Sequence, residues 1–109
     1  MLITQNKCFM SYRFFVGIDV SKSWFDVAVF KVGVHKSRQK LPSQRFDNDE
    51  SGYKAFKTHL AKDLGIRDFS LMFVCLEHTG LYGIGLCLYF ENQGFDYSLE
   101  AGAAISNSL

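Results

Sequence analysis

Two short apolar runs, residues 14–20 and 69–76, place the strongest constraint on the fold of this chain. Each run is bounded by polar residues and has the length of a strand, which is typical of strands buried on both faces. An acidic residue accompanies each run, because Asp19 lies inside the first and Glu77 directly follows the second. We therefore expect an α/β domain in which two buried strands each present a carboxylate.

The segments after the first run predict a hairpin and an exposed edge. Residues 24–34 alternate between apolar and polar side chains and follow the polar turn 21–23, so they favour a second, antiparallel strand. Residues 36–46 are polar and basic and contain Pro42, the only proline. Lysine and proline are typical of edge strands, and this segment is predicted as a third, exposed strand.

Two helices and a last strand complete the expected order. The first helix begins after Asn48 or Asp49 as N-cap and ends at Gly65, and its apolar residues have helical spacing: Tyr53, Phe56, Leu60 and Leu64. The second covers about residues 81–93, with Thr79 as its cap and Gly94 as its end. Alternating Phe95, Tyr97 and Leu99 predict the last strand. A strand meander followed by two crossover helices gives a mixed sheet with helices on its faces.

The 109 residues suit one domain, which we place at residues 14–109. We expect residues 1–13 to be an N-terminal extension without fixed structure. Residues 104–109 carry no helix cap or turn signal, so we expect a truncated domain that lacks its C-terminal part. Three widely spaced cysteines offer no disulfide framework, and no apolar run reaches about 18 residues. These features favour a cytoplasmic protein without a membrane span or signal peptide.

The charge is divided unequally along the chain, although the net charge is only +1. Residues 1–67 hold all twelve basic residues and six acidic ones, whereas residues 68–109 hold five acidic residues and no basic one. The basic residues concentrate in the predicted edge strand and first helix, where they suit either nucleic-acid phosphates or a solvated surface.

Asp19 and Glu77 are the candidate catalytic and metal-binding residues. Carboxylates are rare in strands that are buried on both faces unless they are paired or bind a metal. If the two strands are neighbours, both carboxylates lie at one edge of the sheet, and Mg²⁺ between them would relieve their repulsion. The alternative is structural, with Asp19 capping the turn at 21–23 and Glu77 accepting from helix amides.

The remaining candidates carry weaker signals. Asp26 is expected to pair with Lys22, and His78 is either a phosphate or metal contact or an exposed loop residue. His35 and His59 have no metal-ligand partner at useful spacing. The three glycines at 80, 83 and 85 match no phosphate-binding pattern and indicate close packing.

Several of these segments together resemble one family. They are Val16-Gly17-Ile18-Asp19-Val20-Ser21-Lys22, Phe25-Asp26-Val27-Ala28-Val29, Phe46-Asp47-Asn48 with Gly52, and Glu77-His78-Thr79-Gly80-Leu81-Tyr82-Gly83. In this order they resemble the N-terminal domain of the DEDD transposases of the insertion-sequence family "IS one-ten", which are related to the Piv-type DNA invertases. The resemblance covers about residues 14–109.

The resemblance implies an RNase H-like, RuvC-like fold in which four acids hold Mg²⁺ or Mn²⁺. Asp19 matches the first acid and Glu77 the second, whereas the Asp-x-x-Asp motif and a second domain with a serine nucleophile have no counterpart here. It implies that the intact protein cleaves DNA and transfers strands. It also implies that this fragment is inactive. DNA, a structured noncoding guide RNA and homo-oligomers of the intact protein are the implied partners. The candidate nucleic-acid contacts are Lys22, Lys36, Arg38, Lys40 and His78.

Two other functions remain open. A sugar-kinase or actin-like ATPase lobe also opens with a Gly-x-Asp strand and a hairpin, but Val20 and Lys22 suit its phosphate contacts poorly. A transposase remnant that serves only as an interaction module is the second alternative.

Overall fold

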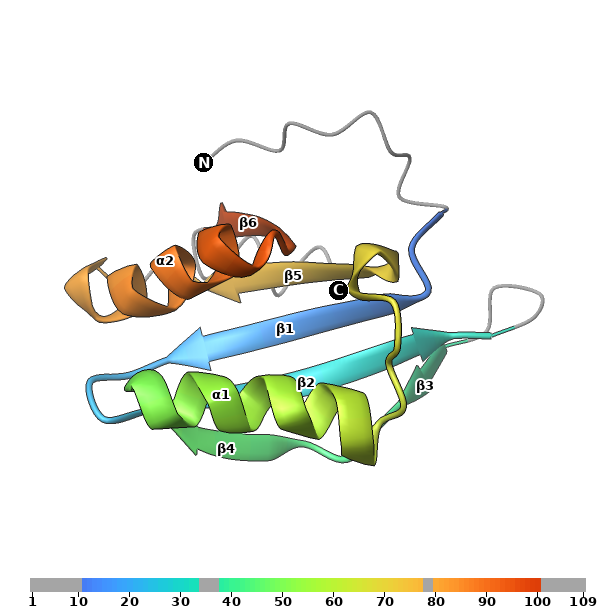
Figure 1. The fold of residues 1–109 in the computed structure, drawn as a ribbon, viewed down its shortest axis with the longest axis horizontal. Helices are drawn as coiled ribbons and strands as arrows, with labels where there is room; N and C mark the ends of the chain where they lie inside the picture. The colour runs from blue at the N-terminus through green and yellow to red at the C-terminus, as the bar shows by residue number, and fades with distance from the viewer. Residues whose placement is uncertain (1–10, 34–37, 78–79, 101–109) are drawn as a thin grey trace.

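A computed structural model describes residues 11–33, 38–77 and 80–100 of the chain. Its framework is one mixed sheet of six strands in the order β3-β2-β1-β5-β6, and β4 also pairs with β2 (Figure 1). The β1–β2 pair is antiparallel, whereas the β1–β5 and β5–β6 pairs are parallel. The strands are β1 (Phe14–Val20), β2 (Trp24–Val32), β3 (Arg38–Lys40), β4 (Gln44–Asp47), β5 (Met72–Glu77) and β6 (Asp96–Glu100). The predicted mixed α/β sheet is confirmed, including the adjacency of its two apolar strands.

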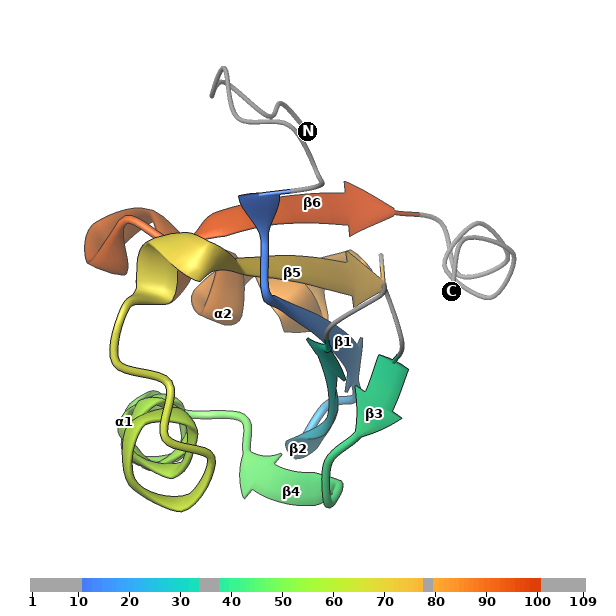
Figure 2. The same cartoon turned by 90° about the vertical axis from the view of Figure 1, so that its right-hand side faces the viewer.

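The two α-helices, α1 (Glu50–Thr58) and α2 (Ile84–Gln93), both pack on the same face of the sheet. Figure 2 shows the sheet curving around this helical side, with β3 and β4 at one margin and β6 at the other. The two crossovers run from β4 to β5 and from β5 to β6, and each advances the sheet in the same direction. Right-handed crossovers that advance in one direction place their helices on one side, which accounts for the arrangement.

The core lies between the helices and one set of alternating strand residues. Val16, Ile18 and Val20 of β1 are each less than 5% exposed and point toward the helices. Phe25 and Phe56 are fully buried, and their ring centroids lie 5.7 Å apart in an edge-to-face contact. Burying an aromatic or aliphatic side chain contributes about 1.5–3 kcal/mol, so this face supplies most of the stability.

The ordered fold begins before residue 14. Tyr12 is 1% exposed, and its hydroxyl donates to Asp96 Oδ2 over 2.7 Å. The Arg13 amide also donates to the Leu71 carbonyl. The expected extension without structure is therefore wrong for residues 11–13, because Tyr12 packs against Phe73 of β5. Residues 1–10 lie outside the described residues.

The predicted edge strand over 36–46 consists of two short strands. β3 pairs with residues 30–32 of β2, whereas β4 pairs with residues 24–27, near the opposite end of the same strand. Pro42 lies between them and has no N–H to donate, so it ends continuous pairing. Leu41 still donates its amide to the Val29 carbonyl, which keeps the connection on β2.

The helix boundaries follow their predicted signals in part. Asp49 caps α1, because its Oδ1 accepts from the Gly52 amide over 2.8 Å, and Gly65 and Gly94 have φ of 70° and 74° at the helix ends. The first helix continues beyond α1 as one π-helical segment, His59–Asp63.

The second predicted helix begins later than expected. A 3₁₀ turn, Gly80–Gly83, precedes α2, and Gly83 rather than a capping side chain is its N-cap. The predicted cap Thr79 lies outside the described residues. Residues Phe69–Leu71 at the start of the predicted fourth strand form another 3₁₀ turn, and β5 begins only at Met72. No helix in the described ranges is long and apolar enough to cross a membrane.

Candidate metal centre

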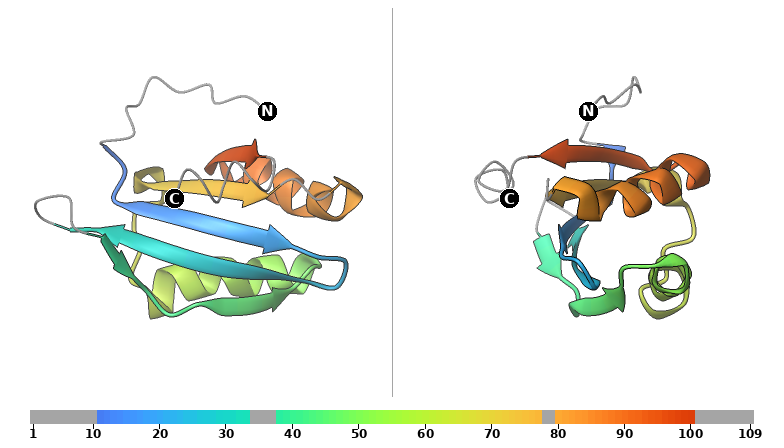
Figure 3. Two further views of the ribbon diagram at one scale, coloured as in Figure 1. Left: turned by 180° about the vertical axis from the view of Figure 1, so that it is seen from behind. Right: turned by 90° about the vertical axis from the view of Figure 1, so that its left-hand side faces the viewer.

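Asp19 and Glu77 lie side by side at the carboxyl ends of two neighbouring strands. Ile18 of β1 is in register with Leu76 of the parallel strand β5, so the next residue of each strand is Asp19 and Glu77. Their carboxyl groups are close enough to interact, and this interaction raises the pKa of Glu77. The arrowheads of β1 and β5 mark this end of the sheet, at the left in Figure 1 and on the right of the left-hand view in Figure 3. The topology thus brings the two predicted site residues together.

The electrostatics of the pair favour a bound cation or a shared proton. The hydrogen bond to Asp19 raises the pKa of Glu77, and partial burial and the negative charge of Asp19 raise it further. Two adjacent carboxylates repel each other when both are ionised, so one holds a proton more tightly. A divalent cation would replace that proton and remove the repulsion.

Asp19 is exposed, although the apolar run around it predicts burial on both faces. Its neighbours Ile18 and Val20 are 3% and 4% exposed because they point toward the helices. Strand alternation turns Asp19 to the opposite face, where the sheet carries no described helix. An ion or a phosphate can reach the carboxylate from solvent at this position.

Charged residues continue in register across the sheet on either side of the pair. Asp26 of β2 is the Cα partner of both Asp19 and Arg45. The Arg45 guanidinium donates to both carboxylate oxygens of Asp26, at 2.7 and 3.2 Å. The expected Asp26–Lys22 pair is therefore wrong, because β4 places Arg45 directly beside Asp26. On the other side, Glu100 of β6 is the register partner of Glu77.

Asn48 holds the two loops that follow the carboxylate-bearing strands. Its Nδ2 donates to the Ser21 carbonyl at 3.0 Å and to the Tyr82 carbonyl at 2.9 Å. Its Oδ1 accepts from the Tyr53 hydroxyl at 2.9 Å. The sequence predicts Asn48 only as a possible helix cap. Its presence in the Phe46-Asp47-Asn48 segment is the one sequence feature that indicates a role in joining the loops.

Two glycines permit the close packing around Asn48. A Cβ at Gly52 would lie 1.7 Å from the Asp47 carbonyl oxygen, and one at Gly85 would lie 2.5 Å from the Tyr53 hydroxyl. Both distances are too short for any side chain. The packing role predicted for the glycines that precede and open the second helix is confirmed at Gly85.

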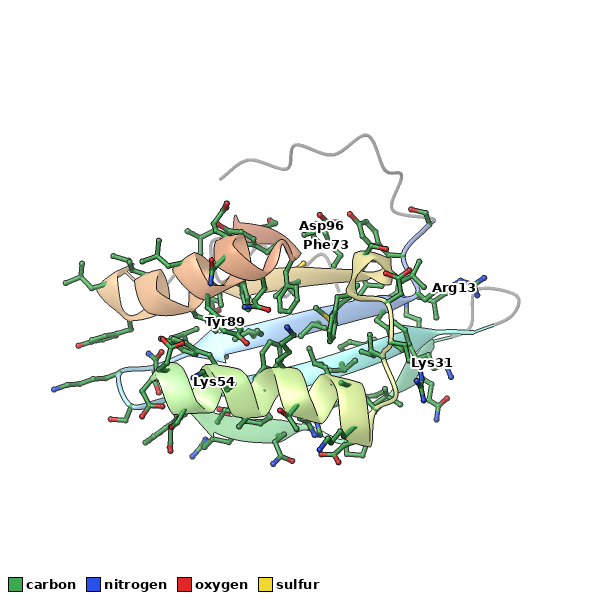
Figure 4. The ribbon with its side chains drawn as sticks, in the orientation of Figure 1. Arg13, Lys31, Lys54, Phe73, Tyr89 and Asp96 are labelled. Carbon is green, nitrogen blue, oxygen red and sulfur yellow. The ribbon has the colours of Figure 1, made fainter. Side chains whose placement is uncertain are left out.

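Of the three predicted nucleic-acid contacts that the structure describes, Lys22 lies near the carboxylates. Lys22 is exposed in the turn between β1 and β2, three residues after Asp19. Arg38 and Lys40 are exposed on β3, which pairs with the far end of β2. Figure 4 shows Arg13 and Lys31 at that far end as well. Lys36 and His78 lie outside the described residues.

The oxygen ligands of the pair suit Mg²⁺ or Mn²⁺. Mg²⁺ binds through one or two carboxylates and completes its shell with water and substrate phosphates. No group of three His, Cys, Asp or Glu side chains forms a metal-ligand cluster among the described residues. Asp19 and Glu77 are thus the two described side chains at this edge with the right chemistry. His59 bonds Asp63 through Nδ1 at 2.7 Å and lies elsewhere.

A second polar feature lies on the helical side of the sheet. Lys54, Lys57, Tyr89 and Gln93 line a groove between α1 and α2. Figure 4 shows Tyr89 between the two helices and Lys54 on α1. This groove is separated from Asp19 and Glu77 by the sheet and contributes nothing to their site.

Comparison with known proteins supports the fold. No family model and no curated protein matches the sequence. Among solved structures, the fowlpox virus Holliday junction resolvase matches with a TM-score of 0.54 and 11% identity over 81% of this chain. A nucleotide-free diol dehydratase-reactivating factor matches with a TM-score of 0.49 and 18% identity over 60% of this chain and 12% of its own. An Aquifex aeolicus Ppx/GppA protein has a TM-score of 0.46 and 5% identity over 82% of this chain and 35% of its own.

The chain has an RNase H-like fold, which the likeness to the resolvase and the mixed sheet order support together. It spans 60% of the length of the resolvase. At this level of identity the likeness establishes the fold alone, because one fold hosts many functions.

Proposed function

We propose that this chain is part of a DNA transposase or recombinase in which Asp19 and Glu77 bind Mg²⁺ or Mn²⁺ for strand cleavage and transfer. The observation that carries the proposal is the register of the parallel strands β1 and β5, which places the two carboxylates side by side at their carboxyl ends. Its place in an RNase H-like sheet and the segments that resemble "IS one-ten" transposases support the same function. The transposase family itself rests on those segments.

In this proposal the two carboxylates position the cation, and the strands position the carboxylates. When bound, the cation would stabilise negative charge on the attacking and leaving oxygens of a phosphodiester. Glu77 and the exposed carboxylate of Asp19 would hold the cation on the outer face of the sheet, which solvent can reach. Asn48 fixes the turn after β1 and the 3₁₀ turn after β5, so the two carboxylates keep their separation.

The remaining partners are proposed from the resemblance. DNA is the substrate, and a structured noncoding RNA and a homo-oligomer belong to the intact protein. The resemblance implies four acids, of which Asp19 and Glu77 are matched in this sequence, so metal binding by these two is the property that we test.

The test is calorimetric titration of the 109-residue chain with Mn²⁺ and with Mg²⁺. We expect weak binding by the wild type and none by Asp19→Ala. Asp47→Asn is the control, because it removes a carboxylate from the same end of the sheet without touching the pair. Equal binding by the wild type and Asp19→Ala would refute the proposal.

A further inference from the structure

Trp24 is a large aromatic residue that the fold holds half outside the core. It is the only tryptophan of the chain and remains 40% exposed as the first residue of β2. By strand alternation it shares the outer face with Asp26, because Phe25 between them is fully buried toward the helices. Half-exposed tryptophan is uncommon away from binding surfaces.

Arg45 lies over this ring and is itself held in place. The guanidinium carbon is 4.4 Å from the Trp24 ring centroid, which is a cation–π contact. The same guanidinium forms the two-point ion pair with Asp26, and the Arg45 and Asp26 side chains remain 58% and 45% exposed. The three residues form a fixed, solvent-accessible unit, which we name the Trp24–Arg45 platform.

The platform lies beside the carboxylate pair. Asp26 is the register partner of Asp19 on the next strand, and Trp24 lies two residues nearer the turn that carries Lys22. A polymer at Asp19 and Glu77 that extends across the strands toward β2 would meet this point. The strand order therefore places an aromatic ring and a guanidinium one strand away from the candidate metal centre.

We propose that the platform binds an unpaired nucleotide of the DNA strand, next to the phosphodiester that a cation on Asp19 and Glu77 would hold. This inference rests on the proposed function, since it assigns the contact for the same substrate. Arg45 contacts one face of the indole. The 40% of Trp24 that remains exposed offers ring surface to one stacked base. Aromatic stacking combined with a cationic group is how proteins hold single strands without reading sequence. A base inside an intact duplex has no free face, so the substrate presents at least one unpaired base here.

The test uses the fluorescence of Trp24 and a fluorescein-labelled oligothymidylate of about 12 nucleotides, in EDTA at low salt. We expect saturable quenching of the tryptophan by the unlabelled oligonucleotide. Anisotropy should show that Trp24→Ala weakens the labelled complex about fivefold to a hundredfold, as expected for loss of one stacked base. Trp24→Phe should retain most of the affinity, because it keeps an aromatic face.

Three further arms make the result specific. Arg45→Gln should also weaken the complex, because it removes the guanidinium that lies over Trp24 and supplies the cationic group of the platform. A blunt duplex of the same length should bind wild type and Trp24→Ala equally. Leu88→Ala, which truncates an exposed residue of α2, should leave all affinities unchanged.

The proposal is overturned if the wild type does not bind the oligonucleotide, or if a folded Trp24→Ala variant binds it as tightly as the wild type. Because EDTA removes divalent cations, this outcome is independent of the calorimetric test of Asp19. If the wild type binds the oligonucleotide but not Mn²⁺, only the metal-centre proposal is refuted. If it binds Mn²⁺ but not the oligonucleotide, only the platform proposal is refuted.

Discussion

The two faces of the sheet use the same strands for different purposes. On the helical face, β1 contributes Val16, Ile18 and Val20 to a continuous buried core. On the outer face, the same strand contributes Gly17 and the exposed carboxylate of Asp19. Alternation along a strand thus separates the residues that stabilise the fold from those that offer chemistry. Substitutions on the two faces should therefore have different consequences.

The largest effect on stability is expected from Phe56→Ala on the helical face. Phe56 is fully buried and contacts the rings of Phe25, Phe46 and Phe90. The substitution should lower the free energy of unfolding by about 3–5 kcal/mol, because it removes apolar contacts and leaves a cavity. Urea unfolding at 25 °C measures this loss. Leu88→Ala, in contrast, should change the value by about 0.5 kcal/mol or less.

Asn48→Ala should be the next most harmful substitution. It leaves the carbonyls of Ser21 and Tyr82 without their side-chain donor and removes the acceptor for the Tyr53 hydroxyl. A loss of about 1–3 kcal/mol is expected, because three hydrogen bonds of about 0.5–1.5 kcal/mol each are removed, of which two are part-buried. Urea unfolding gives the value, with Asn92→Ala on α2 as a control. Similar small losses for both variants would argue against the role of Asn48 between the two loops.

Asp19→Asn should not destabilise the protein, in contrast to the two substitutions above. In EDTA at pH 7.5 the substitution removes the repulsion between the Asp19 and Glu77 carboxylates. The melting temperature should therefore stay the same or rise, as is common where a site is built for a ligand that is absent. A clear fall in melting temperature would show that Asp19 serves the fold, and the separation of the two faces would fail.

The smallest effect concerns pH and Tyr97 of the helical face. Burial, followed by the hydrogen bond to Glu91, raises the pKa of Tyr97 to about 12 from its ordinary value of 10. Because the pKa of Tyr97 is higher in the folded than in the unfolded state, its contribution to the free energy of unfolding is fully present below pH 10. This contribution is lost as the pH rises from 10 to 12. Tyr97→Phe should unfold with a weaker pH dependence across that window. Thermal melts at several pH values compare the two proteins.

Much of the framework could be predicted because its signals are local. The apolar runs identify β1 and β5, and Asp49, Gly65 and Gly94 mark helix boundaries. Since parallel neighbours end at one edge, the meeting of Asp19 and Glu77 follows from the strand order. The strand order alone is therefore enough to predict that Asp19 and Glu77 lie close together.

The remaining features depend on contacts between distant segments. Asp26 pairs with Arg45 instead of Lys22 because of the β2–β4 register, which no local pattern specifies. Asn48 joins segments near residues 21, 53 and 82, and each hydrogen bond exists only after all three have packed. The alternation of residues 24–34 predicts only that Trp24 lies in a strand. Its contact with Arg45 depends on the pairing of β2 with β4.

The most direct test of the carboxylate pair is a carbon-13 NMR titration of the Glu77 side chain with and without saturating Mg²⁺. Without the cation, the pKa of Glu77 should lie above its ordinary value because of Asp19. With Mg²⁺, the pKa should fall, since the cation competes with the proton for the same oxygens. An ordinary pKa that Mg²⁺ does not change would contradict the shared site.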